Sequence, residues 1–278
     1  MIADSRLRKV AARIAAVPGV IGVALGGSRA RGTHGPDSDL DLGLYYRPEL
    51  AVGELSALAA DLSGPGTQIT EPGGWGPWVD GGGWLVIEGT AVDWIYRDLD
   101  RVRAAWVDAR GGRYAFHLQA GHPLGFADFA YAGELASAVL LADPSGELAA
   151  LQASMRAGYP PRLAAAIVDG LWEAGFLIDG ARKAVGRADA AYIAGCLFRA
   201  VGLCAHAVHA SAGSWLLNEK GAVRTAAALP TAPRDFAARA GTLFAATGGT
   251  PEHLAATLDA AESLLADVRA ACAGGAGR

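Results

Sequence analysis

Residues 26–41 combine glycine, serine and acidic side chains in an order that suits phosphate and metal chemistry. Gly27 and Ser28 follow an apolar run, and Asp39 and Asp41 begin the next one. Glycines let the backbone approach phosphate oxygens closely, and the first N–H groups of a short helix would face those oxygens. Carboxylates at alternate positions of a strand share one face, where they can bind Mg²⁺. The segment therefore predicts a site for a nucleoside triphosphate and a divalent metal.

A third carboxylate, Asp93, interrupts the β-branched and aromatic run at residues 90–96. A carboxylate buried in the middle of a strand is costly unless it is paired or bound to a metal. We therefore expect Asp39, Asp41 and Asp93 to be both the catalytic residues and the ligands of two Mg²⁺ ions. One ion would activate an attacking hydroxyl and the other would neutralise a leaving pyrophosphate, with Asp93 assisting deprotonation. The alternative is that Ser28 caps a helix and the aspartates lie in a polar turn.

The elements that must position these residues follow from the hydrophobic pattern. Up to residue 125, short apolar runs alternate with helical segments, which is typical of an α/β module. We predict strands at residues 20–25, 39–46, 67–70, 84–88 and 91–96, and helices at 4–16, 48–62 and 98–109. The Gly- and Trp-rich segment 71–83 is interpreted as a surface loop with tryptophan packed on the sheet, or as an aromatic platform for stacking a base.

The second half of the chain is rich in alanine and follows a helical period, with prolines near several expected helix starts. We predict helices at residues 127–142, 145–157, 160–186, 189–211, 233–246 and 251–272. The fold class is therefore α+β. Residues 1–125 would form the catalytic module, and residues 126–278 would form a helical bundle that binds the acceptor.

The pattern of Gly27-Ser28, Asp39-x-Asp41 and Asp93 resembles the DNA polymerase β-like nucleotidyltransferase superfamily, in particular the small bacterial aminoglycoside and lincosamide nucleotidyltransferases. The resemblance covers about the first hundred residues. It implies a polymerase β-like module with a mixed sheet, an NTP substrate, with ATP preferred, and transfer of a nucleoside monophosphate to a hydroxyl of a small acceptor. Such an acceptor could be an aminoglycoside-like antibiotic. Segments 121–126 and 218–222 resemble uncharacterised bacterial nucleotidyltransferase-domain proteins, a likeness that names no substrate.

Two other classes of function remain open. The chain could modify tRNA or protein, or it could be a non-catalytic partner in a toxin–antitoxin system. The formal net charge of −4 argues against a general nucleic-acid binder and favours a cationic acceptor. The second half also shows no basic track with interleaved aromatics, which RNA binding would require.

Several polar residues outside the motif are further candidates. Lys220 could bind the triphosphate, and Glu219 could orient the acceptor, although a solvated pair at a helix C-cap explains both equally well. His122 is either an acceptor contact or a residue that fixes its loop. His206 and His209 share a helix face and are interpreted as a polar seam of the bundle rather than as metal ligands.

Composition points to a cytoplasmic enzyme. The chain is 52% hydrophobic and 19% charged, which excludes a disordered protein. Its three cysteines have neither metal-ligand nor redox spacing, and an odd number suits a reducing compartment. The first residues are charged and lack the apolar run of a signal peptide, so no membrane partner is expected.

Overall fold

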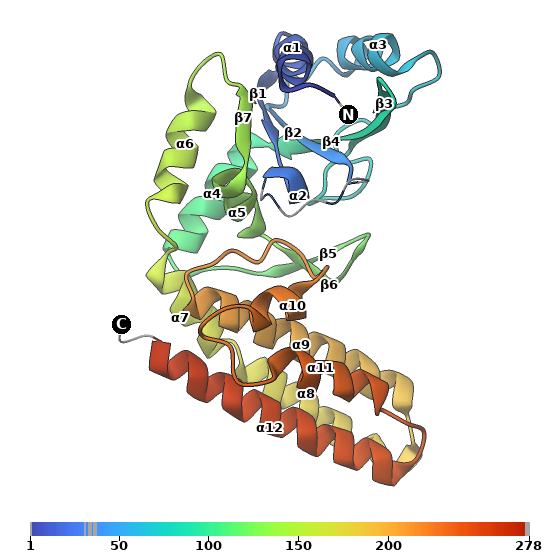
Figure 1. The fold of residues 1–278 in the computed structure, drawn as a ribbon, viewed down its shortest axis with the longest axis vertical. Helices are drawn as coiled ribbons and strands as arrows, with labels where there is room; N and C mark the ends of the chain where they lie inside the picture. The colour runs from blue at the N-terminus through green and yellow to red at the C-terminus, as the bar shows by residue number, and fades with distance from the viewer. Residues whose placement is uncertain (1, 31, 33–34, 36–37, 276–278) are drawn as a thin grey trace. The chain divides into compact units, whose positions relative to one another are not determined.

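The computed structural model describes residues 2–30, 32, 35 and 38–275 and divides the chain into two compact units (Figure 1). Unit 1 consists of Met1–Asp108 and Ala115–Gly158, and unit 2 consists of Ala109–Tyr114 and Tyr159–Arg278. This division differs from the boundary expected at residue 125. Residues 115–158 belong with the first unit because they include a strand of its sheet, as described below.

Unit 1 is built on a mixed sheet in the order β3-β4-β2-β1-β7. The strands are β1 (Val20–Leu25), β2 (Leu40–Tyr46), β3 (Gly82–Ile87), β4 (Thr90–Asp98) and β7 (Val139–Ala142). The central pair, β2 and β4, is parallel, and the other neighbours are antiparallel. The expected strand at residues 67–70 is reduced to one bridge between Ile69 and Gly83.

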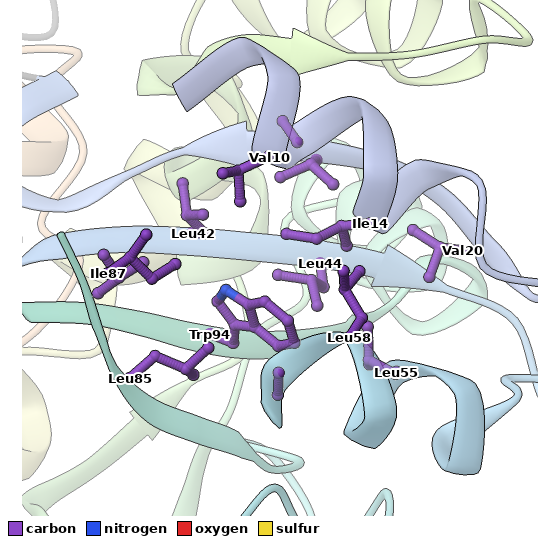
Figure 2. Packing of buried hydrophobic residues seen from close by; sticks show 14 of the residues in the cluster. Val10, Ile14, Val20, Leu42, Leu44, Leu55, Leu58, Leu85, Ile87 and Trp94 are labelled. Carbon is purple, nitrogen blue, oxygen red and sulfur yellow. The ribbon is translucent and has the colours of Figure 1, made fainter. Parts of the chain in front are cut away.

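One face of this sheet carries the hydrophobic core of unit 1. Alternate residues of β2 and β4 point to this face, and α1 (Asp4–Ala15) and α3 (Val52–Ser63) cover it (Figure 1). Figure 2 shows Leu42, Leu44 and Trp94 of the sheet together with Ile14 of α1 and Leu55 of α3, all fully buried. Because the period of a strand is two, the neighbouring residues of β2 and β4 must point to the opposite face.

One part of the opposite face is covered by a helix, and another part is partly accessible to solvent. At the end of β4, buried Arg97 donates two hydrogen bonds to Glu134 of α5 (Ala130–Ser137), at 2.6 and 2.9 Å. This ion pair holds α5 against the sheet. Nearer the start of β4, Asp93 is only half-buried. A functional site can therefore form at this end of the face.

The segment after α4 (Leu99–Arg110) differs from the sequence prediction. Residues 116–127 form a hairpin of β5 (Phe116–Gln119) and β6 (His122–Ala127), and the helix expected at residues 127–142 ends with α5. Residues Val139–Ala142 form β7, which pairs with β1 at the edge of the sheet. The helix α6 (Glu147–Arg156) completes unit 1.

Unit 2 is helical. It contains α7 (Pro161–Asp169), α8 (Trp172–Arg182), the short η1 (Val185–Arg187), α9 (Ala190–Ser211), α10 (Ala222–Ala227), α11 (Phe236–Ala245) and α12 (Pro251–Gly275). The helix expected at residues 160–186 is thus two helices, which meet at Gly170 and Leu171. In the described residues, α9 alone is long and apolar enough to cross a membrane, but most of it is buried against the other helices of the unit, as in the core of a soluble protein.

These architectures confirm the predicted α+β class with a mixed sheet followed by helices.

Candidate active site

The turn between β1 and the short helix α2 (Gly27–Ala30) is built around the Asp41 side chain. The Gly26 N–H donates to the Asp41 carbonyl oxygen at 2.8 Å, so the turn continues the pairing of β1 with β2. Gly27 follows with φ +63°, in the left-handed region. A Cβ on Gly27 would lie 1.7 Å from Asp41 Oδ2. Glycine is therefore required here for its backbone conformation and because the carboxylate occupies the space of a side chain.

Asp41 and Asp93 are paired in the register of β2 and β4. Paired positions of neighbouring strands lie about 4.8 Å apart and point to the same face of the sheet. The two carboxylates therefore lie side by side on the face opposite the core. Asp39 lies just before the first residue of β2 and is exposed. The three aspartates singled out in the sequence thus gather at one end of one sheet face, next to the Gly27 turn.

Arg29 holds the segment that leads into β2. Its Nη2 donates to the Ser38 carbonyl oxygen at 2.6 Å, and its Nε donates to the carbonyl oxygens of Ser38 and Asp39 at 3.1 and 3.3 Å. These hydrogen bonds show Arg29 in contact with the fold. Arg31, which also follows the turn, lies outside the described residues.

The electrostatics of the site favour a bound cation. The pKa of Asp93 is raised to about 6, first by burial and then by the negative charges of Asp41 and Asp39. Carboxylates that destabilise one another's charge are stabilised by a metal ion. Among residues 2–30, 32, 35 and 38–275, no three acidic, histidine or cysteine side chains form a metal-binding group by themselves. The donor set still fits Mg²⁺, which commonly takes one or two carboxylates and fills its other positions with water and substrate phosphates.

Comparison with known proteins identifies this part of the chain. A family model described as a nucleotidyltransferase domain matches residues 5–64, from α1 to the end of α3. This chain contains a nucleotidyltransferase domain. The match confirms the resemblance drawn from Gly27-Ser28 and Asp39-x-Asp41, and nucleotidyl transfer is the activity class that it indicates. Asp93 lies on β4, beyond the matched residues.

No curated protein matches the chain. Among solved structures, a nucleotidyltransferase-like protein from Exiguobacterium sibiricum 255-15 is 11% identical. The alignment covers 95% of this chain and 74% of that chain, with a TM-score of 0.48.

Unit 1 also carries an exposed aromatic residue, beyond the matched residues, that was not a site candidate in the sequence. Trp84 of β3 is the cross-strand partner of Asp93 and is 69% exposed. Its ring stacks on that of Trp75, with centroids 4.6 Å apart. Trp78, from the same Gly- and Trp-rich segment, instead packs on His117, with centroids 3.6 Å apart. Both tryptophans of segment 71–83 are thus partly buried against another ring, and the exposed Trp84 lies just beyond the segment, on β3. Nothing in the sequence indicated the exposure of Trp84, because residues 84–87 read Trp-Leu-Val-Ile, an uninterrupted apolar run.

His122 begins β6 and packs edge-on against Phe126, with ring centroids 5.5 Å apart. Its neighbour across the hairpin is Gln119. The pair that sequence reasoning missed in this region is His117 and Asp128, whose Nε2 and Oδ2 atoms are 3.1 Å apart. Asp128 also accepts from the Ala115 N–H at 3.0 Å, so this pair fixes the hairpin to the chain that follows it.

Glu219 and Lys220 belong to unit 2, in the turn before α10. The Asn218 side chain accepts from the Lys220 N–H at 2.9 Å, and the Glu219 carbonyl oxygen accepts from the Ala222 N–H at 3.1 Å. This turn precedes a helix, so the alternative of a helix C-cap is wrong. The left-handed Gly221, with φ +73°, is the N-cap residue of α10.

The remaining polar residues singled out in the helical half are held by protein partners. His206 and His209 are buried in α9, and the His209 ring nitrogens lie 3.2 Å from Ser214 Oγ and 3.1 Å from Thr225 Oγ1. Burial lowers the pKa of His206 to about 3 and that of His209 to about 4. Both are therefore neutral at physiological pH and form the polar seam that the sequence predicted.

Proposed function

We propose that this protein is a Mg²⁺-dependent nucleotidyltransferase that transfers AMP from ATP to a hydroxyl of a small acceptor of the aminoglycoside type. The observation that supports the proposal best is the pairing of Asp41 with Asp93, directly beside the Gly27 turn. A turn that admits no side chain and two adjacent carboxylates are the parts that phosphoryl-type transfer needs, because catalysis there depends on positioning and on charge neutralisation.

In this proposal Gly27 and Ser28 bind the β and γ phosphates of ATP. Asp39, Asp41 and Asp93 would hold two Mg²⁺ ions, which when bound neutralise charge on the pyrophosphate and favour ionisation of the hydroxyl. The acceptor oxygen forms a bond to the α-phosphorus as the bond from that phosphorus to the bridging oxygen breaks, and pyrophosphate leaves. Asp93 would accept the hydroxyl proton as the bond to phosphorus forms.

We assign the choice of acceptor to residues beyond this catalytic face, with the helical unit as the main contributor. Lys220 is proposed to bind the triphosphate, and Glu219 and His122 are proposed to contact the acceptor. The support for Lys220 is its exposed ammonium group, a strong donor to phosphate oxygens. Replacing Lys220 with alanine should raise the KM for ATP without changing the metal dependence of the reaction.

The test is an incubation of the protein with α-phosphate-labelled ATP and Mg²⁺. The acceptors offered are aminoglycosides, lincosamides, tRNA and a cell extract. We expect label on an aminoglycoside. The Asp41→Asn variant should lose about 10³-fold or more of this activity, about 4 kcal/mol of barrier, while keeping the fold. Label on tRNA or on protein would redirect the acceptor assignment, and equal labelling by wild type and Asp41→Asn would refute the catalytic role of the carboxylates.

A further inference from the structure

Trp84 presents an aromatic ring on the catalytic face of the sheet. Directly opposed residues of antiparallel strands share a face, and Trp84 is opposed to Asp93. Leu85 and Ile87, its neighbours along β3, point to the core and are buried. Trp84 is 69% exposed although it lies in the middle of a strand. A large exposed aromatic side chain at a functional site is a candidate for binding a ligand.

The position of this ring is fixed by the segment that precedes β3. Trp75 stacks on Trp84, and the Trp75 carbonyl oxygen accepts from Gln119 Nε2 at 2.9 Å. Gln119 Oε1 accepts from the N–H groups of Trp78 and Val79, each at 3.0 Å. The buried Gln119 side chain of β5 thus holds the backbone at Trp75 and at Trp78 and Val79. The stacked pair is therefore organised before any ligand arrives.

Further contacts fix the end of the same segment. Asp80 is buried, accepts from the Tyr46 hydroxyl at 2.5 Å and pairs with Arg101 at 3.0 Å. The Gly82 N–H donates to Thr70 Oγ1 at 2.9 Å. At Gly82, where φ is +145°, a Cβ would meet the Trp94 carbonyl oxygen at 1.8 Å and the Trp75 ring at 3.2 Å. Packing this close means that the segment cannot shift the Trp75 ring without breaking contacts on both sides.

The order of residues across the sheet indicates which substrate meets this ring. From β1 to β3 the row runs Gly27, Asp41, Asp93 and Trp84. In an in-line displacement, the attacking and leaving oxygens lie on opposite sides of the phosphorus. If the leaving pyrophosphate lies at the Gly27 turn, the attacking hydroxyl lies beyond Asp41, toward Asp93 and Trp84. The ring is therefore on the side of the acceptor.

We infer that Trp84, supported by Trp75, is an acceptor subsite that stacks on a positively charged amino-sugar ring. This inference rests on the proposed function. Tryptophan is the best aromatic partner for a cation, and the carboxylates of Asp39 and Asp93 and the phosphates of bound ATP add negative potential beside it. The acceptor hydroxyl would then reach Asp93 while the ring of the same molecule lies over Trp84.

The test measures binding of kanamycin A to the full-length protein by calorimetry at 0.15 M salt, with Mg²⁺ and a non-hydrolysable ATP analogue present. The variants are Trp84→Ala, Trp84→Phe and, as a matched control, Trp172→Ala, which removes a tryptophan of α8 that is 66% exposed. Loss of a desolvated cation–π contact should weaken kanamycin binding about 10-fold or more in Trp84→Ala. Trp84→Phe should restore part of this affinity, and Trp172→Ala should behave like wild type.

The affinity for the ATP analogue separates the possible outcomes. It should stay within about twofold of wild type in every variant, because the ring does not contact the nucleotide. Loss of nucleotide affinity in Trp84→Ala would show that the ring stacks on the base and would overturn the inference. Unchanged kanamycin affinity in Trp84→Ala, or wild type that binds the analogue but not kanamycin, would also overturn it. A wild-type protein that binds no analogue in the presence of Mg²⁺ would instead refute the proposed function.

Discussion

Replacing Gly27 with alanine tests how the turn and the proposed catalytic carboxylate of Asp41 depend on each other. The new Cβ would lie 1.7 Å from Asp41 Oδ2 and 2.7 Å from its Cγ, distances that non-bonded atoms cannot keep. Since Gly27 is fixed by the adjoining hydrogen bond from Gly26 to Asp41, the carboxylate has to rotate away. We expect turnover to fall about 10²-fold, the effect of misplacing a catalytic group by about 1 Å.

The expected loss of stability has two parts. A non-glycine residue in the left-handed region costs about 1–2 kcal/mol. Overpacking against Asp41 adds about 1–3 kcal/mol. Gly89 gives the first part alone, because its φ is +75° and no described atom lies within 4 Å of a Cβ placed there. Gly89→Ala should therefore lower the free energy of unfolding by less than Gly27→Ala does.

The assay is urea unfolding of a double-mutant cycle. In an Asp41→Ala background the carboxylate is absent, so Gly27→Ala should cost only what Gly89→Ala costs. The coupling energy between positions 27 and 41 should then be about 1–3 kcal/mol. If Gly27→Ala costs the same with and without the Asp41 carboxylate, the contact between them does not determine the choice of glycine, and the reasoning fails.

Three further perturbations test other parts of the structure. The pKa of Asp93 is raised to about 6, so its proton favours the folded state below pH 4, and this contribution is lost as pH rises through 6. In metal-free buffer, Asp93→Asn should therefore raise the free energy of unfolding at pH 8 by about 1 kcal/mol, a value discounted for the exposure of the side chain. At pH 3.5 the same substitution should leave the free energy of unfolding unchanged. The pKa of His206 is lowered to about 3, so this histidine takes up a proton more readily in the unfolded state, and the free energy of unfolding falls as pH drops from 6.5 toward 3. In His206→Gln, the free energy of unfolding measured in urea should depend less on pH over that range. An unchanged slope would contradict the burial argument. Gln119→Leu leaves the Trp78 and Val79 N–H groups without their acceptor, so the melting temperature and the kanamycin affinity should both fall while the ATP analogue binds as before.

The site was more predictable than its surroundings because its residues follow simple periods. Asp39 and Asp41 had to share a face once residues 39–46 were read as a strand, and Asp93 stood out in an apolar run. What sequence reasoning could not supply was the register that places Asp41 opposite Asp93, or the reason for glycine at position 27. Both depend on contacts between segments far apart in the chain.

Short apolar segments account for the errors in the fold. Residues 139–142 read Val-Leu-Leu-Ala, which suits a helix as well as a buried strand, and only pairing with β1 decides between them. The hairpin at residues 116–127 was missed although the Ala120-Gly121 turn signals it, and Gly121 has φ +84°. The exposure of Trp84 could not be read from its type, because a strand pattern does not say which face receives a cover.

The late position of β7 in the chain determines when the sheet of unit 1 can be completed during synthesis. β1 begins at residue 20, but the strand that covers its edge ends at residue 142, after every other strand of the sheet has been made. Until then a nascent chain presents the backbone groups of β1 as a template for pairing with other chains. A fragment that stops near residue 124 would keep this exposed edge permanently and should aggregate. A gene fusion that exchanges residues 159–278 should therefore join the two parts after Gly158, where the last segment of unit 1 ends.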